Sequence, residues 1–501
     1  MQYLSTRDFG KKVSAAQAIA QGICQDGGLF VPQEIPKLSS HDLEQMQKCS
    51  YVERAQKVLS LFLTDFSEKE IADCVQAAYT EKKFPGGPAQ LSALQEQDCS
   101  MYLLELWHGP TCAFKDMALQ VLPHLLTKSC QKIHTDKTAV ILVATSGDTG
   151  KAALEGFKDV PGTKILVFYP QNGVSPMQKR QMVTQEGENV AVCAIEGNFD
   201  DAQTGVKKIF INTDMCQKLA KNGMMFSSAN SINLGRLLPQ IIYYISAYCD
   251  LMVNGKIQDR QEVNVAVPTG NFGNILAAYY AKQMGLPIKK LICASNANNV
   301  LTEFLRTGCY NRNRAFYTTI SPSMDILISS NLERMLSTLT GSDEQVKNWM
   351  QELSQTGTYQ VNDDVMQKLK NIFWAGFCDD QKTKEEIHTL YQEENYLCDP
   401  HTAVAVNVYK QYVSKTGDAS TPTIIASTAS PYKFADSVLQ AIGGSAASDD
   451  DFAKIQELAT VTGTPIPQPI QALRSKTVRF ANCCRPDEMF SKTLKLIGAD
   501  S

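Results

Sequence analysis

The sequence predicts an α/β protein in which parallel sheets are flanked by helices and preceded by a largely helical N-terminal module. After residue 91 the chain repeats short apolar runs, and each run ends in a turn rich in Gly, Ser or Asn before a segment of helical length. The runs are continuously apolar rather than alternating, which is typical of strands covered on both faces. Between residues 41 and 80, apolar residues instead recur at helical spacing without a strand-like run.

The predicted strands are the apolar runs at residues 102–106, 139–145, 164–169, 190–195, 224–227, 263–268, 291–295 and 422–427. Residues 331–389 return to helical spacing, so we expect helices there. The segment after residue 445 begins with an acidic run and continues with scattered prolines. We interpret it as a C-terminal extension.

Length, charge and cysteine content limit the class of protein. A chain of 501 residues exceeds the roughly 250 to 300 that one core usually holds, so we expect two to four domains. A net charge of -4 without a basic run argues against a nucleic-acid partner, and no apolar stretch reaches the ~20 residues that span a bilayer. The 15 cysteines are scattered without a C-x-x-C pair, and the first 21 residues lack a signal-peptide core. We therefore expect reduced thiols, a cytoplasmic location and no metal site.

Two strand-to-helix junctions have the residues expected of anion sites. At 143–150 the chain reads VATSGDTG, and the backbone N–H groups of a helix that opens there carry the positive end of the helix dipole. A helix start that is simply capped by Ser146 or Thr149 is an equally good interpretation. At 267–274 the chain reads VPTGNFGN, whose glycines let the backbone approach an anion closely. This loop lacks the spacing of ATP and NAD motifs, so a small phosphorylated cofactor fits it better.

A third junction, LELWHGPTCAFKD at 104–116, contains the candidate nucleophile Lys115. A lone lysine is ordinarily a solvated surface cation. Phe114 and Met117 flank this one, however, and desolvation lowers a lysine pKa toward the neutral amine that forms a Schiff base. His108 is either a second site residue or a hydrogen-bonded packing residue.

These motifs resemble those of the threonine synthase family, within the tryptophan-synthase-β-like, fold type II group of pyridoxal-phosphate enzymes. Several separated motifs in the same order are more specific than any one of them. The matching segments are YLSTR at 3–7, QDGGLFVP at 25–32, WHGPTCAFKD at 107–116, ATSGDTG at 144–150, NSINLGR at 230–236, GNFGN at 270–274 and SPSMD at 321–325.

The resemblance implies a fold of two open, mostly parallel sheets and a division of the chain. Residues 1–95 would form the N-terminal module, 96–135 and 236–445 a large cofactor domain, and 136–235 a small α/β domain. Residues 446–501 would pack on the large domain. The cofactor would be pyridoxal 5'-phosphate, bound covalently as an aldimine by Lys115. The cofactor phosphate would lie at Gly270, Asn271, Phe272, Gly273 and Asn274, and the hydroxyl of Thr428 would lie near the pyridine nitrogen.

The resemblance also implies a substrate site with two anion pockets. The substrate carboxylate would lie at Ser146, Gly147, Asp148 and Thr149, and the substrate phosphate at Asn230, Ser231 and Arg236. Lys151 and Asp325 are further substrate-binding candidates. An alternative for Arg236 is a capped helix with a surface ion pair. The family segment near Thr428 usually reads STAHP, whereas this chain has STASP, with Ser430 in place of the histidine.

The activity implied is conversion of O-phospho-L-homoserine and water to L-threonine and phosphate, by a monomer or homodimer. Three alternatives stay open. A phospho-lyase would release 2-oxobutyrate from the same substrate, and a Ser/Thr dehydratase-like lyase would not need the second phosphate site at residues 230–236. A degenerate homologue that only binds the cofactor would be expected to lack Lys115, which this chain retains.

Overall fold

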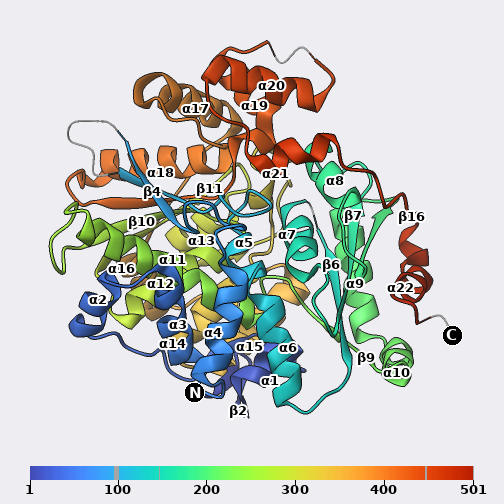
Figure 1. Ribbon diagram of the computed structural model, residues 1–501. Helices are drawn as coiled ribbons and strands as arrows, with labels where there is room; N and C mark the ends of the chain where they lie inside the picture. The colour runs from blue at the N-terminus through green and yellow to red at the C-terminus, as the bar shows by residue number, and fades with distance from the viewer. Residues whose placement is uncertain (95–100, 146, 446–447, 500–501) are drawn as a thin grey trace.

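The computed structural model describes residues 1–94, 101–145, 147–445 and 448–499 (Figure 1). Within these residues, two sheets made mainly of parallel strands dominate the fold, one of six strands and one of five. In Figure 1 the five-stranded sheet lies on the right and the six-stranded sheet on the left. This arrangement confirms the predicted α/β class. No helix among the described residues combines the length and apolar composition needed to cross a membrane.

The six-stranded sheet, called the large sheet below, is parallel except at one edge, where β4 pairs antiparallel with β5. Alternate residues of its central strands enter different cores: Val265 joins the core that includes helix α12, and Ala266 joins the core that includes α18. Burial on both faces explains the continuously apolar runs. In sheet order the strands are β14 (Phe373–Phe377), β11 (Ile288–Ser295), β10 (Val263–Pro268), β15 (Thr423–Ser427), β5 (Met101–Glu105) and β4 (Gln90–Ala93).

Helices pack on the large sheet and against one another around it. They are α5 (Asp116–Leu119), α6 (Leu122–Lys132), α11 (Leu234–Val253), α12 (Gly273–Met284), α13 (Val300–Thr307), α14 (Leu332–Thr340), α15 (Asp343–Thr356), α16 (Asp363–Ile372), α17 (Asp380–Glu394), α18 (Pro400–Thr416) and α19 (Ala435–Ile442). Two short 3-10 turns, η1 (Pro322–Met324) and η2 (Pro431–Phe434), lie beside the candidate site described below.

The five-stranded sheet, called the small sheet, is parallel throughout. In sheet order its strands are β16 (Cys483–Cys484), β8 (Val190–Ile195), β7 (Thr163–Pro170), β6 (Thr138–Ala144) and β9 (Met224–Ser227). The helices associated with it are α7 (Asp148–Phe157), α8 (Pro176–Val183), α9 (Phe199–Ile211), α10 (Thr213–Lys221) and α22 (Met489–Ile497).

The N-terminal module is helical where the spacing predicted helices. Its helices α2, α3 and α4 each begin at a capping box, in which Ser39, Ser50 or Ser67 exchanges hydrogen bonds with the residue three positions later. A three-stranded antiparallel sheet of order β2-β1-β3 precedes them and was not foreseen. The bounds are β1 (Tyr3–Ser5), β2 (Asp8–Val13), α1 (Ala15–Gln21), β3 (Phe30–Pro32), α2 (Ser40–Gln47), α3 (Tyr51–Phe62) and α4 (Glu68–Ala78).

The prediction that residues 331–389 are helical is wrong at two places. Strand β13 (Thr358–Gln360) pairs with β12 (Cys309–Asn311) in a small separate ladder, and β14 forms an edge of the large sheet beside β11. Both strands are short and flanked directly by helices, so no turn-bounded apolar run marked them in the sequence.

The prediction that residues 446–501 pack on the large domain is wrong for their second half. Helix α20 (Asp451–Thr462) does pack on α19, but β16 then adds a strand to the small sheet beside β8. Ala194 N–H donates to Asn482 O over 2.8 Å, and Glu196 N–H donates to Cys484 O over 3.0 Å. An open sheet edge offers unpaired N–H and C=O groups, and the extension covers this one. Two shorter elements, α21 (Gln468–Gln471) and the 3-10 turn η3 (Ala472–Arg474), join the two halves, and the 3-10 turn η4 (Pro486–Glu488) follows β16.

Candidate active site

The turns predicted to carry the site all follow the carboxyl ends of parallel strands. The Lys115 turn follows β5, the loop at Gly270 follows β10, and Thr428 follows β15 in the large sheet. The turns at Gly147 and Asn230 follow β6 and β9 in the small sheet. Open α/β sheets bind ligands at these ends.

Backbone hydrogen bonds pin the lysine turn against the segment after β15. Phe114 N–H donates to Thr428 O over 2.8 Å, and Ser430 N–H donates to Cys112 O over 3.1 Å. Lys115 comes directly after Phe114 and immediately precedes α5. Two neighbouring strands of the large sheet therefore bring Lys115 beside Thr428.

Lys115 lies in a mostly enclosed, polar setting. Its Nζ donates to Ser323 Oγ over 3.2 Å and lies 3.8 Å from Asp148 Oδ2, and its side chain is only 11% exposed. The Phe114 ring centroid is 5.7 Å from Nζ. Burial lowers the pKa of Lys115 to about 8, although the Asp148 carboxylate acts in the opposite direction. The predicted desolvation is thus present, and a substantial fraction of the amine is neutral near pH 8.

Asp148 forms a buried ion pair that links the two sheets. Its Oδ1 accepts from Lys433 Nζ over 2.6 Å and from Gln178 Nε2 over 3.0 Å, and the Lys433 side chain is fully buried. Burial alone would raise the pKa of Asp148, but the charges of Lys433 and Lys115 hold that pKa well below its usual range. Sequence reasoning missed Lys433, because nothing local relates a lysine of η2 to an aspartate at the start of α7.

The Asp148 carboxylate is therefore unsuited to bind a substrate carboxylate, because both are anions. The start of α7 remains suitable, because its N-cap Gly147 supplies no side-chain cap. Thr145 Oγ1 accepts from the N–H of Gly147 and of Gly150, and no hydrogen bond among the described residues takes up the N–H of Asp148 or Thr149. The backbone rather than the Asp148 side chain is the candidate carboxylate pocket here. Ser146 lies outside the described residues.

The glycine loop has the shape of an anion cradle. A Cβ on Gly270 would lie 2.7 Å from Ser323 O, so only glycine fits against η1 there. Phe272 adopts the left-handed conformation with φ of 62°, and α12 then begins at Gly273 without a side-chain cap. Asn271 O accepts from the backbone N–H of Asn331, which fixes the loop from outside. The first N–H groups of α12 are left to bind a ligand.

Asn274 supplies an unpaired donor at the same helix start. Its Oδ1 accepts from the Tyr243 hydroxyl over 2.9 Å and also from Tyr244, but its buried Nδ2 has no partner. A buried donor without a partner is costly, and a phosphate oxygen would satisfy it. The residues at this loop therefore fit the predicted cofactor phosphate.

Arg236, at the start of α11, is a buried cation. Among the described residues no carboxylate pairs with it: Nη1 donates to Ala229 O over 3.0 Å, and Nε has no partner. Burial lowers its pKa to about 10. The interpretation as a surface ion pair is wrong, because Arg236 is only 3% exposed. A desolvated guanidinium without an anion is unfavourable, so this position fits a phosphate ligand.

Arg334 of α14 holds the turn at residues 230–233, which precedes Arg236. Arg334 donates through Nη1 to Ser231 O over 3.4 Å, and through Nη2 to Ile232 O. Asn233 N–H donates to Asn230 O over 3.0 Å, which closes the turn. The half-buried side chains of Asn230 and Ser231 thus stand on a rigid turn one helical turn before Arg236.

The structure gives Lys151 other partners than a substrate. Its Nζ donates to Glu155 Oε2 over 2.9 Å and to Gln185 Oε1. These contacts satisfy the hydrogen-bond donors of Lys151 and balance its charge, so the predicted role of Lys151 in binding substrate lacks geometric support.

Asp325 is likewise saturated by its own surroundings. Its Oδ1 accepts from Asn296, Asn298 and the Thr319 hydroxyl, and its Oδ2 accepts from Thr319 N–H. These hydrogen bonds hold the loop that leads into η1, and the role of Asp325 in binding substrate stays a prediction.

Two further residues that the sequence did not single out support Lys115 from η1 and α18. His401 Nε2 accepts from Ser323 N–H over 3.1 Å, and His401 Nδ1 lies 2.6 Å from Asp399 Oδ2. This arrangement fixes η1, so that Ser323 Oγ reaches both Lys115 and, over 3.4 Å, Asp148. Ser323 and His401 are 78 positions apart, and no sequence spacing connects them.

The geometry also bears on His108 and Ser430. His108 Nε2 lies 2.6 Å from Glu105 Oε2 and its ring stacks on Trp107, which favours the packing interpretation. Ser430, which replaces the family histidine, is completely buried, and its hydroxyl has no hydrogen-bond partner.

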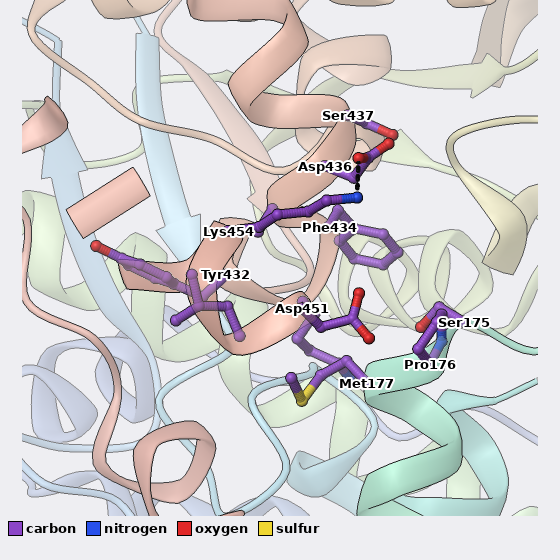
Figure 2. A pocket seen from close by; sticks show the side chains of 12 residues that line it. Ser175, Pro176, Met177, Tyr432, Phe434, Asp436, Ser437, Asp451 and Lys454 are labelled. Carbon is purple, nitrogen blue, oxygen red and sulfur yellow. Dashed lines mark hydrogen bonds and ion pairs between the residues drawn. The ribbon is translucent and has the colours of Figure 1, made fainter. Parts of the chain in front are cut away.

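Figure 2 shows a pocket that is lined by residues of η2, α19 and α20 and by Ser175, Pro176 and Met177 at the start of α8. In it, Lys454 of α20 pairs with Asp436 of α19 over 2.5 Å. The pocket has a volume of about 130 Å³, well below the roughly 300 Å³ at which small-molecule sites begin. It is therefore not the substrate site.

Comparison with known proteins agrees with this geometry. Three family models match: threonine synthase N terminus at residues 2–79, pyridoxal-phosphate dependent enzyme at 83–361, and threonine synthase C-terminal at 402–487. The chain is 41% identical over 459 residues to human threonine synthase-like 1, covering 88% of this chain and 60% of that protein. It thus spans less than two thirds of that relative's length.

Two threonine synthases match over most of their length. The enzyme from Saccharomyces cerevisiae is 36% identical over 466 residues, covering 88% of this chain and 89% of its own length. The structure of pyridoxal-phosphate-bound threonine synthase from Brucella melitensis superposes with a TM-score of 0.87 at 33% identity, covering 100% of this chain and 99% of that one. The chain therefore belongs to the threonine synthase family of pyridoxal-phosphate dependent, fold type II enzymes.

Proposed function

We propose that this chain is a threonine synthase that converts O-phospho-L-homoserine and water to L-threonine and phosphate. The observation that carries the proposal is Arg236, a buried guanidinium without a carboxylate partner among the described residues. Arg236 lies at the start of α11, whereas the loop at 270–274 leads into α12, so the two offer separate candidate phosphate sites. A substrate phosphate needs the second one.

The residues that would hold the cofactor are Lys115, the loop at 270–274 with its free Asn274 amide, and Thr428. When bound, pyridoxal phosphate supplies an electron sink for negative charge at the substrate Cα. Thr428 presents a hydroxyl rather than a carboxylate, and a hydroxyl does not supply the negative charge that would hold a proton on the pyridine nitrogen.

Lys115 is placed to move protons at the substrate. Its pKa of about 8 leaves much of the amine neutral under mildly alkaline conditions, so it can accept a proton from the substrate Cα. Ser323 Oγ accepts a hydrogen bond from Lys115 Nζ and fixes its direction. Asp148 adds a negative charge near Nζ, and Lys433, which pairs with Asp148, largely balances that charge. Burial of these groups excludes water from the amine.

Arg236 would bind the substrate phosphate and stabilise it as the bond to Cγ breaks. Two parallel charge-assisted hydrogen bonds from a guanidinium suit a phosphate geometrically. A Ser/Thr dehydratase has no such group to bind, so a buried, unpaired arginine at this turn favours a phosphorylated substrate.

A phospho-lyase that yields 2-oxobutyrate is the second candidate, because it uses the same substrate and differs in whether water adds at Cβ. The holoenzyme should be given O-phospho-L-homoserine, and phosphate, threonine and 2-oxobutyrate should be quantified. We expect phosphate and threonine in equal amounts. Phosphate with 2-oxobutyrate would instead identify a phospho-lyase, and no phosphate release would overturn both assignments.

The charges of Asp148 and Lys433 predict how the rate of cofactor uptake at Lys115 depends on pH, and removing each charge should shift that dependence in the opposite direction. The apo protein should take up pyridoxal phosphate faster as the pH rises through about 8, because only the neutral Lys115 amine attacks an aldehyde. Asp148 raises the pKa of Lys115 and Lys433 lowers it. Asp148→Asn should therefore move the rise to lower pH, and Lys433→Met should move it to higher pH.

The uptake rates can be followed by absorbance, with circular dichroism confirming that each variant is folded. Shifts in the same direction for both variants, or no shift in either, would show that these charges do not set the state of Lys115.

We also place the enzyme in a reducing compartment such as the cytoplasm and expect a monomer or homodimer. Every described cysteine is a free thiol, including Cys193 and Cys484, whose sulfur atoms lie 3.7 Å apart. Light scattering of the holoenzyme would measure the assembly, and a larger oligomer would contradict the expectation.

A further inference from the structure

Polar side chains of α11 meet the start of α12 beside the glycine loop. A Cβ on Gly273 would lie 3.7 Å from Gln240 Nε2, so the two helices approach each other closely there. Gln240, Tyr243 and Tyr244 are all buried on α11. None of the three lies in a segment that matches the family motifs, yet they surround the side chain of Asn274.

Two tyrosine hydroxyls converge on the amide oxygen of Asn274. Tyr243 donates to Asn274 Oδ1 over 2.9 Å, and Tyr244 donates to the same oxygen. Burial raises the pKa of both hydroxyls well above the usual value, so both keep their protons at physiological pH. Because an amide oxygen has two lone pairs, these two bonds occupy Oδ1 fully.

Gln240 decides how the two hydroxyls share this task. Its Nε2 donates to Arg236 O over 2.7 Å, so its Oε1 faces Tyr243, whose hydroxyl lies 3.1 Å away. The single proton of Tyr243 is therefore shared between Gln240 Oε1 and Asn274 Oδ1. We expect Tyr244 to contribute more than Tyr243 to the orientation of Asn274.

The orientation of the Asn274 amide decides which atom is left for a ligand. With Oδ1 occupied by the two tyrosines, the buried Nδ2 is the atom without a partner. An amide turned by half a rotation would instead present Oδ1, an acceptor, and an acceptor does not bind a phosphate oxygen. The tyrosine hydroxyls thus stabilise the orientation that suits an anion.

We propose that Tyr244, assisted by Tyr243, is a positioning residue that orients the Asn274 amide so that Nδ2 donates to the cofactor phosphate. This inference rests on the proposed cofactor-phosphate site at 270–274 and adds to it the group that sets its polarity. Neither tyrosine contacts the phosphate itself in this account. Both act through Asn274.

The test compares two aldehydes on the full-length protein after its cofactor has been removed. Pyridoxal 5'-phosphate and pyridoxal differ only in the phosphate, and absorbance titration gives the Kd of each. Tyr244→Phe should weaken binding of the phosphorylated aldehyde about five- to tenfold, the size of one net hydrogen bond, and should leave the Kd of pyridoxal within about twofold. Tyr243→Phe should show the same selective loss to a smaller extent.

The matched control is Tyr248→Phe, which removes another buried hydroxyl of α11. Tyr248 donates to Gln261 O over 3.1 Å, away from Asn274, so this variant should keep the wild-type Kd for both aldehydes. A double-mutant cycle then tests whether Tyr244 acts through Asn274. In an Asn274→Ala background, Tyr244→Phe should cause no further loss of affinity for pyridoxal 5'-phosphate.

Three outcomes would overturn the inference. Unchanged preference for the phosphorylated aldehyde in Tyr244→Phe, or an equal loss of affinity for both aldehydes, would show that the tyrosine only packs. A full additional loss in the Asn274→Ala background would show that it does not act through Asn274. Failure of the underlying site looks different: a wild-type protein that binds both aldehydes equally well would overturn the phosphate site at 270–274 together with this inference.

Discussion

Lys115→Ala should lower turnover of O-phospho-L-homoserine by at least about 10³-fold, because it removes both the group that anchors the cofactor and the base beside the substrate Cα. The change should also prevent covalent trapping. After borohydride treatment, the wild-type protein should carry the reduced cofactor on the peptide that contains Lys115, and the variant should carry none. The intact mass and a peptide map measure this directly.

A matched control for this variant is Lys82→Ala, which removes an exposed lysine. It should keep wild-type turnover and trapping. If Lys115→Ala were still labelled by borohydride at another lysine and still released phosphate at the wild-type rate, the assignment of Lys115 would be wrong.

Arg236→Ala should lower kcat and raise KM for O-phospho-L-homoserine, because the phosphate is bound in the ground state and held more strongly as it leaves. Loss of one preorganised donor to a developing charge costs about 2 to 4 kcal/mol of transition-state stabilisation, roughly 30- to 1,000-fold in kcat/KM. Arg236→Lys should recover only part of this, since an ammonium does not form two parallel bonds.

The affinity for pyridoxal phosphate separates the two anion sites. It should be nearly unchanged in Arg236→Ala, because the loop at 270–274 holds the cofactor phosphate. Arg474→Ala, which removes an exposed arginine, is the control and should behave as wild type. An equal loss of cofactor and substrate binding in Arg236→Ala would show that the two phosphate sites were exchanged in our assignment.

Much of the fold was predictable because its signals are local. Continuously apolar runs marked eight strands, and each of them is present, because both faces of most of these strands are buried. The desolvation of Lys115 was also predictable, because its neighbour Phe114 contributes to it. Strand β14 was not, because a five-residue edge strand between two helices lacks a distinguishing period.

The sequence did not reveal Lys433 and His401 for one common reason. Lys433 pairs with a residue 285 positions away, and His401 with one 78 positions away, so only the folded chain brings each pair together. The same reason applies to Lys151 and Asp325: each lies in a matching motif, but neighbouring side chains take up its polar atoms, so a role in binding substrate stays a prediction for both. Motif position predicted which turns follow the carboxyl ends of the strands, and three-dimensional packing decided which partners their side chains have.

The path of the oxygen atoms tests the central claim most directly. The reaction of O-phospho-L-homoserine should be run in ¹⁸O-labelled water and the products analysed by mass spectrometry. We expect the label in the hydroxyl of threonine and none in the phosphate, because the C–O bond at Cγ breaks and water adds at Cβ. Label in the phosphate together with unlabelled homoserine would show hydrolysis at phosphorus, which would contradict the proposed function.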